Sequence, residues 1–195
     1  MKEISDRIRI HGTEVLSKRK YTLKSVDASW RRNDGEWQRL TREVYEKGNG
    51  AAILLYNRAR RTVVLIRQFR LPTFLNGYNH ELIEVPAGML DGAAPEDRIR
   101  SEVEEETGYS ISQIEKVFEA FMSPGALTER LYLFVAAYNP SSKTGDGGGL
   151  KHEGEDIAVL ELPFDEALAM MKDGRICDAK TIILLQYAQL HLFRD

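Results

Sequence analysis

The sequence predicts a mixed α/β fold, an α+β sandwich in which helices pack on a mixed sheet, with a small antiparallel β region in front. Polar strand-like stretches come first, and apolar, β-branched stretches follow the break at 48–50. Helical stretches are placed between and after these strands, as in a sheet covered by helices. We therefore expect an N-terminal β-sheet region over 1–47, serving dimerisation, and a main domain over 48–195.

Composition restricts the class of protein. The 195 residues are 43% hydrophobic and 29% charged, which is typical of one globular domain with a small appendage. The net charge of −3 leaves no basic field, so nucleic acid is not an expected partner. No apolar run reaches the roughly 18 residues of a membrane span. Cys177 is the single cysteine, which fits a reducing cytoplasm, and we expect a cytoplasmic protein without a membrane partner.

The N-terminal region contains a predicted β-hairpin. Residues 21–31 and 36–46 have strand-like composition, and Asp34-Gly35 between them is a strong turn signal. Much of the surface of both strands is polar, so a two-stranded ribbon of this kind buries little by itself. The hairpin therefore needs a partner.

The main domain alternates apolar strands with helices. Pro95 suits the first turn of a helix, and Gly108 suits its end. The loop 139–155 is polar and rich in glycine, and we expect it to be mobile. The predicted strands are 51–56, 62–69, 80–85, 114–122, 127–138 and 157–162, and the predicted helices are 95–107, 165–172 and 178–192.

The helix 95–107 carries clustered glutamates. Glu102, Glu105 and Glu106 stand at i, i+3 and i+4, so their carboxylates share one face of the helix. Ile99 and Val103 lie on the adjoining face and can anchor the helix to the sheet. Clustered carboxylates suit Mg²⁺, with Mn²⁺ as a substitute. Taken alone, however, an acidic run is more often a solvated helix face.

The segment 88–109 resembles the Nudix box: Gly, five residues, Glu, seven residues, then Arg-Glu-apolar-x-Glu-Glu-x-Gly-apolar. Three departures occur: the spacing is one residue short, Ala94 takes the place of the first Glu, and Ser101 replaces the Arg. In the family these groups mainly support the loop, so the departures concern loop geometry more than chemistry. The matching positions are Gly88, Glu102, Val103, Glu105, Glu106, Gly108 and Tyr109.

The resemblance extends beyond the box. Pro124 lies fifteen residues past Tyr109, as in the ADP-sugar branch of the Nudix hydrolases. Segments 48–55, 67–70, 84–88 and 123–125 are similar to that branch, and 74–77, 128–129, 155–157, 161–164 and 179–181 are similar to its GDP-mannose hydrolases. The resemblance implies Mg²⁺-dependent hydrolysis of the pyrophosphate bond of a nucleotide sugar, with GDP-mannose favoured. ADP-ribose hydrolysis and an inactive metabolite-binding module remain alternatives.

The resemblance also implies residue roles. Glu102, Glu106 and the backbone carbonyl of Ala87 would hold the metal, and Glu155 on the late loop would complete the site. Glu155 and Glu105 are the candidate catalytic carboxylates, and Glu153 is the rival to Glu155. Substrate contacts would come from Arg42, Glu43, Arg70, Ala87, Gly88, Met89, Glu129 and Lys180, with Lys20 and Tyr21 as weaker candidates.

The weak N-terminal hairpin predicts an assembly. Open strand edges are normally covered or paired. Members of the resembled branch exchange this region across a two-fold axis, so we expect a homodimer with shared active sites, in which Arg42 or Glu43 reaches the partner's substrate.

Overall fold

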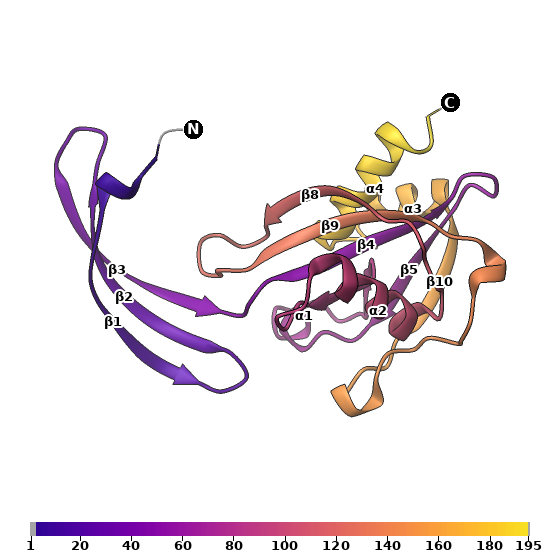
Figure 1. Cartoon of the computed structure of the whole chain (residues 1–195), viewed down its shortest axis with the longest axis horizontal. Helices are drawn as coiled ribbons and strands as arrows, with labels where there is room; N and C mark the ends of the chain where they lie inside the picture. The colour runs from indigo at the N-terminus through magenta and orange to yellow at the C-terminus, as the bar shows by residue number, and fades with distance from the viewer. Residues whose placement is uncertain (1–2, 195) are drawn as a thin grey trace. The chain divides into compact units, whose positions relative to one another are not determined.

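The structure, a computed structural model, describes residues 3–194 and divides into two compact units. The smaller unit contains the chain up to Asn49 together with Ser123–Arg130. The larger unit contains Gly50–Met122 and Leu131–Asp195. Figure 1 shows the strands of the smaller unit in indigo and violet and the helices of the larger unit in magenta to yellow.

The smaller unit is a three-stranded antiparallel sheet in the order β1-β2-β3. The predicted hairpin is confirmed as β2 (Thr22–Arg31) and β3 (Trp37–Glu46), but the expected two-stranded ribbon is wrong by one strand. That strand, β1 (Ile8–Lys18), follows the 3-10 turn η1 (Ser5–Arg7). Most of β1 is exposed. Its only sequence signal is the short alternation of isoleucine with charge at 7–10.

The segment 123–130 joins this sheet through the end of β3. Tyr45 bridges to Leu127 in parallel, and its backbone N–H donates to the carbonyl of Ala126 over 2.8 Å. The predicted strand 127–138 therefore starts later, at Arg130, because its first residues pair with the other unit.

The larger unit is built on a mixed sheet, as the sequence predicts. Strand β4 pairs in parallel with β9, whereas β5 pairs antiparallel with β4, β6 and β10. The order is β10-β5-β4-β9-β8, with β6 beside β5 and β7 beside β4. The strands are β4 (Gly50–Asn57), β5 (Thr62–Gln68), β6 (Leu82–Glu84), β7 (Ala87–Met89), β8 (Glu115–Phe121), β9 (Arg130–Ala137) and β10 (Ala158–Pro163).

Helices cover both faces of this sheet. The predicted helices are confirmed as α2 (Pro95–Thr107), α3 (Phe164–Lys172) and α4 (Ala179–His191). The short helix α1 (Leu71–Leu75) was not predicted, nor were the 3-10 turns η2 (Pro140–Ser142) and η3 (Lys151–Glu153). None of the helices within residues 3–194 is long and apolar enough to span a bilayer.

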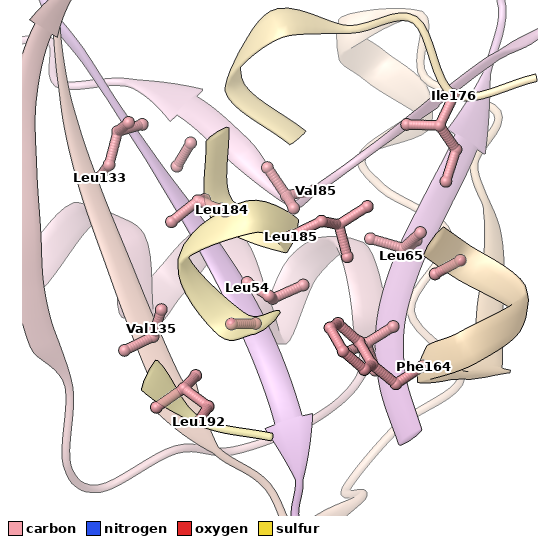
Figure 2. Packing of buried hydrophobic residues seen from close by; sticks show 14 of the residues in the cluster. Leu54, Leu65, Val85, Leu133, Val135, Phe164, Ile176, Leu184, Leu185 and Leu192 are labelled. Carbon is pink, nitrogen blue, oxygen red and sulfur yellow. The ribbon is translucent and has the colours of Figure 1, made fainter. Parts of the chain in front are cut away.

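Alternate residues of β4 contribute side chains to two hydrophobic cores. Leu54 packs on one face with Leu184 and Leu185 of α4, and Figure 2 shows these side chains meeting between helix and strand. Ile53 faces the opposite side and packs with Ile99 and Val103 of α2, all of them fully buried. Burying such side chains stabilises the fold by about 1.5–3 kcal/mol each. This packing holds α2 against the sheet.

Candidate active site

The helix α2 presents its glutamates at the edge of the second core. Ala94 precedes the helix without a side-chain cap, and Gly108 ends it in the left-handed conformation at φ 74°. Glu102 and Glu106 are almost completely buried, at 4% and 1% exposure, while Glu105 is partly exposed. A solvated acidic face would leave all three in water, so this alternative is wrong for Glu102 and Glu106.

The loop and strand β7 lie directly against these two carboxylates. The backbone N–H of Ala87 donates to Oε2 of Glu106 over 3.0 Å. A Cβ atom added to Gly88 would stand 1.6 Å from Oε1 of Glu102, so only glycine permits this approach. Residues 87 and 88 therefore lie directly against the two carboxylates of α2.

Burial outweighs the cations that lie near the two carboxylates. Burial raises the pKa of Glu102 to about 7; Arg98 opposes this shift and Glu105 adds to it. Burial, and then the charge of Glu102, raise the pKa of Glu106 well above its usual value, against the hydrogen bond from Ala87. Two adjacent carboxylates that resist ionisation are the environment that a hard divalent cation would relieve.

The described part of the chain supplies few further metal-binding side chains beside this pair. Within residues 3–194, no group of three or more His, Cys, Asp or Glu side chains is arranged to hold a metal ion. Two carboxylates with an adjoining backbone strand nevertheless fit a cation such as Mg²⁺, which keeps several waters and uses one or two protein carboxylates. The residues therefore fit a divalent ion.

The glycine-rich loop is fastened to the C-terminal end of α2. The sequence predicts a mobile loop, but the N–H groups of Gly148 and Gly149 donate to the carbonyls of Glu106 and Glu105, both over 3.0 Å. Thr144 and Gly145 donate in the same way to Gly108. These bonds satisfy carbonyls that a helix end leaves open.

Glycine is required where this loop touches the helix. A Cβ on Gly147 would stand 2.5 Å from the carbonyl oxygen of Glu106, and a Cβ on Gly108 would stand 2.1 Å from that of Gly145. Both residues have positive φ, at 70° and 74°. The glycine run thus attaches the loop to the helix that carries the glutamates.

This attachment brings Glu155 towards the carboxylate pair. Its Oε2 accepts the N–H of Leu150 over 2.9 Å, and its charge is close enough to raise the pKa of both Glu102 and Glu106. Glu153 is exposed in the 3-10 turn η3 and pairs with His152 at 3.9 Å.

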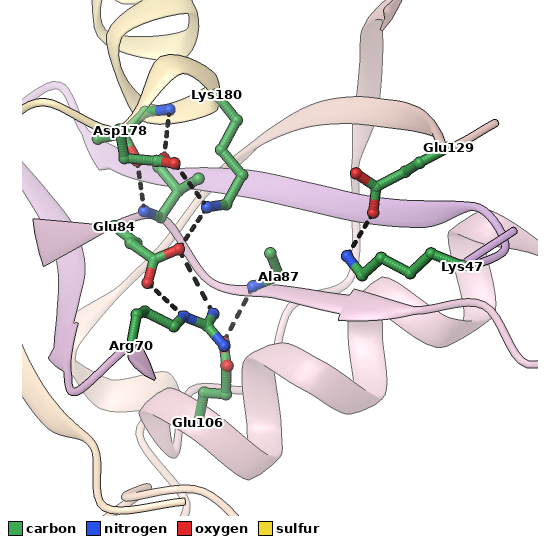
Figure 3. A network of polar contacts seen from close by, with 10 residues as sticks. Lys47, Arg70, Glu84, Ala87, Glu106, Glu129, Asp178 and Lys180 are labelled. Atoms are coloured by element: carbon green, nitrogen blue, oxygen red, sulfur yellow. Dashed lines mark hydrogen bonds and ion pairs between the residues drawn. The ribbon is translucent and has the colours of Figure 1, made fainter. Parts of the chain in front are cut away.

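A further buried carboxylate, Glu84, was missed by sequence reasoning. Nε of Arg70 donates to its Oε1 over 2.8 Å, and Lys180 bonds to its Oε2 and, over 3.0 Å, to Asp178 (Figure 3). Burial alone would raise the pKa of Glu84, but the charges of Lys180 and Arg70 lower it overall. The available signal was an acidic residue inside the apolar run 82–85.

This network involves two of the expected substrate contacts, Arg70 and Lys180. Arg70 and Lys180 both donate hydrogen bonds to Glu84. Lys180 is buried at 9% exposure, whereas the Arg70 side chain is 40% exposed and keeps surface for a ligand. Met89 lies on β7 with its carbonyl accepting from Arg98.

The remaining candidates lie in the smaller unit. Arg42 and Glu43 are exposed on β3, and Arg42 donates to the neighbouring carbonyl of Thr41 over 2.9 Å. Glu129 is buried and pairs with Lys47 at 2.5 Å (Figure 3). The structure thus groups the site candidates into a set in each unit.

Two family models match the chain. The model described as the NUDIX domain covers residues 46–185, which is well over half of the chain. This chain belongs to the Nudix family. The model described as the GDP-mannose pyrophosphatase NudK N-terminal domain covers residues 7–45.

Named relatives are similar over nearly the whole chain. A GDP-mannose pyrophosphatase of Pectobacterium atrosepticum is 52% identical over 186 residues, 95% of each chain. One of Escherichia coli O1:K1 / APEC is 48% identical over 193 residues, covering 98% of this chain and all of the relative. A solved structure titled as an ADP compounds hydrolase has a TM-score of 0.70 at 18% identity, with 95% of this chain and 94% of that chain covered, and supports the fold.

Family membership gives the buried carboxylates a context. Nudix hydrolases generally use a divalent metal ion, and the buried pair on α2 lies within the matched domain. The departures at Ala94 and Ser101 leave this pair in place. Ser101 is exposed and its hydroxyl makes only a long contact of 3.5 Å to the carbonyl of Asp97.

Proposed function

We propose that this Nudix hydrolase cleaves the pyrophosphate bond of GDP-mannose with Mg²⁺, giving a nucleoside monophosphate and a sugar 1-phosphate. The observation that carries the proposal is the pair of buried carboxylates of Glu102 and Glu106 on α2, whose pKa values are raised despite the nearby Arg98. The choice of GDP-mannose rests on relatives about half identical over nearly the full chain.

The proposal gives each residue of the site a separate role. Glu102, Glu106 and the carbonyl of Ala87 would hold the metal, and Glu155 would complete the set. When bound, a divalent ion supplies positive charge that neutralises the bridging phosphates and activates water. The protein restrains the carboxylates through Gly88 on one side and the glycine loop on the other.

A carboxylate then takes the proton of the attacking water. We assign this to Glu155, because the fastened loop keeps its charge near Glu102 and Glu106. Glu105 is the second candidate, since it shares the helix and is partly open to solvent. Glu153 is the weaker alternative because its side chain is 52% exposed and paired with His152.

Substrate binding is proposed for residues of both units. Exposed cationic groups on Arg42 and Arg70 suit phosphate oxygens, which guanidinium groups bind through two donors. Lys180 supports Arg70 by sharing Glu84 with it. The remaining proposed contacts are Glu43, Ala87, Gly88, Met89 and Glu129.

The decisive experiment is a substrate panel. The protein is incubated with Mg²⁺ and GDP-mannose, ADP-ribose, other nucleotide sugars or nucleoside triphosphates, and the products are separated. Preferred release of a nucleoside monophosphate from GDP-mannose supports the proposal. Preference for ADP-ribose would show that ADP-ribose, and not GDP-mannose, is the substrate. Metal-dependent binding without any product would indicate an inactive metabolite-binding module.

We further propose a cytoplasmic homodimer formed through the N-terminal region 1–47, with 48–195 as the catalytic domain. Of the three strands in that region, Ala28 is the one buried hydrophobic residue, so the sheet has almost no core of its own. Ile10, Val15 and Leu16 on β1 are exposed by 45–60% and would be covered by a second copy.

Complementation tests shared sites. Chains carrying Arg42→Ala are mixed with chains carrying Glu102→Gln, and subunit exchange is verified. If each site uses both copies, random exchange restores up to about a quarter of wild-type activity by two-fold symmetry. No recovery after proven exchange, or a monomer by light scattering, would contradict this assembly.

A further inference from the structure

The loop before α2 is connected to the glutamates by one cation, Arg98. Its Nε donates to the carbonyl oxygen of Met89 over 3.1 Å. One terminal nitrogen pairs with Oε1 of Glu102, and the other lies 3.7 Å from Oε2 of Glu105. A single guanidinium therefore contacts the loop backbone and two glutamates of the helix.

The position of Arg98 makes these contacts possible. It precedes Glu102 by four residues, so both side chains lie on the same face of the helix, one turn apart. Its side chain is 24% exposed and that of Glu102 is 6% exposed, so the pair is shielded from most solvent. A planar guanidinium can bond a carboxylate and a carbonyl at once, which a lysine ammonium does with less geometric restraint.

Glu106 also bonds the segment 87–89, through the N–H of Ala87, but among the described residues Arg98 is the side chain that bonds both this segment and the glutamates. Ser101, at the position where the Nudix pattern has arginine, is exposed and bonds within its own helix turn. Ala94, at the position of the first box glutamate, caps nothing. Gly88 brings the loop against Glu102 but contributes no side chain.

We infer that Arg98 is a positioning residue that replaces the missing box arginine in this chain. It fixes the carbonyl of Met89, and with it the segment 87–89, against Glu102, so that backbone and carboxylate oxygens face the same space. The inference deepens the proposed function, on which it rests for the metal site. It assigns Arg98 no contact with substrate or metal.

The test compares Arg98→Gln with Arg100→Gln. Arg100 is a matched control, because it lies on the same helix and its guanidinium bonds two backbone carbonyls, those of Ile111 and Ser112, at 2.9 and 2.7 Å. Loss of Arg98 should weaken Mn²⁺ binding and lower kcat by about 10–100-fold, the range for residues that orient ligands. The control should keep both within about threefold.

Mn²⁺ affinity is measured by titration without substrate, so this arm holds even if GDP-mannose is the wrong substrate. Arg98→Lys should recover only part of the loss. Unchanged Mn²⁺ affinity in Arg98→Gln would overturn the inference, as would losses that match Arg100→Gln. Tighter Mn²⁺ binding in Arg98→Gln would also overturn it, because Arg98 would then be only a competing positive charge.

Discussion

The larger unit buries two sets of carboxylates under similar packing but with opposite electrostatics. Glu84 is 2% exposed and is contacted by Arg70 and Lys180, so its pKa is lowered. Glu102 and Glu106 are similarly buried, but Arg98 beside Glu102 and the charge of Arg70 near Glu106 do not outweigh their burial, and both pKa values are raised. The first set is neutralised by the protein's own cations, whereas in the second set burial outweighs them.

This difference separates structure from chemistry. A buried carboxylate with its own cations contributes to a folded state without any ligand, although its removal leaves those cations unpaired. A buried carboxylate pair whose burial outweighs its cations costs stability, and such perturbed groups cluster at functional sites. The predictions that follow compare the two sets, beginning with the largest effect.

Removing one charge from the metal pair should nearly abolish activity. Glu102→Gln and Glu106→Gln each remove a charged oxygen ligand, and a loss of about 4 kcal/mol in transition-state stabilisation corresponds to about a thousandfold in rate. Wild-type protein in EDTA should be inactive as well. Steady-state assays on GDP-mannose measure these changes, and full activity in EDTA or in both variants would refute the catalytic assignment.

The loop glutamates show whether a third carboxylate belongs to the metal pair. Glu155→Gln should lower kcat by roughly 10²–10⁴, because a general base is lost. Glu153→Gln is the matched control on the same loop and should change kcat by less than about tenfold. The reverse order would assign the role to Glu153 instead.

Removing the charge of Glu84 should affect folding rather than metal binding. Glu84→Gln leaves Arg70 and Lys180 without their shared carboxylate, and breaking a buried pair costs about 3–5 kcal/mol in unfolding free energy. Urea denaturation measures the loss. Asp173→Asn, which breaks an exposed pair with Arg175, is the control and should leave the unfolding free energy nearly unchanged. Equal losses would remove the distinction between the two sets.

The two sets should respond to pH in opposite directions in metal-free protein. The pKa of Glu102 rises from 4.5 to about 7 on folding, so the folded state holds a proton that the unfolded state releases. Its stabilising contribution is complete below pH 4.5 and is lost as the pH rises to 7. Glu84 has a lowered pKa, so its contribution is present above 4.5 and is lost in acid.

The melting temperature at pH 5 and pH 8 in EDTA tests this response. Between pH 5 and pH 8, the melting temperature of Glu102→Gln should fall by about 2–6 °C less than that of wild type. This difference corresponds to about 1–2 kcal/mol in unfolding free energy after allowance for solvent screening. Saturating Mg²⁺ should reduce this difference, because the ion takes the place of the proton. An identical pH response in both proteins would show that Glu102 ionises normally.

The sequence by itself determined the elements whose signals are local. Pro95 and Gly108 mark the ends of α2, and the glutamates between them share a face by helical spacing alone. Asp34-Gly35 marks the turn between β2 and β3 in the same way. These signals lie within a few residues of what they predict, so no tertiary information is needed.

Only the tertiary structure decided which charges meet. Glu84 and Lys180 are 96 residues apart, and the glycine run reaches α2 from about 40 residues along the chain. Arg98 was one charged residue among many until the fold placed the carbonyl of Met89 beside it. The cations that the fold places beside a buried carboxylate decide whether its charge is neutralised. Burial is itself a property of the folded chain rather than of residue spacing.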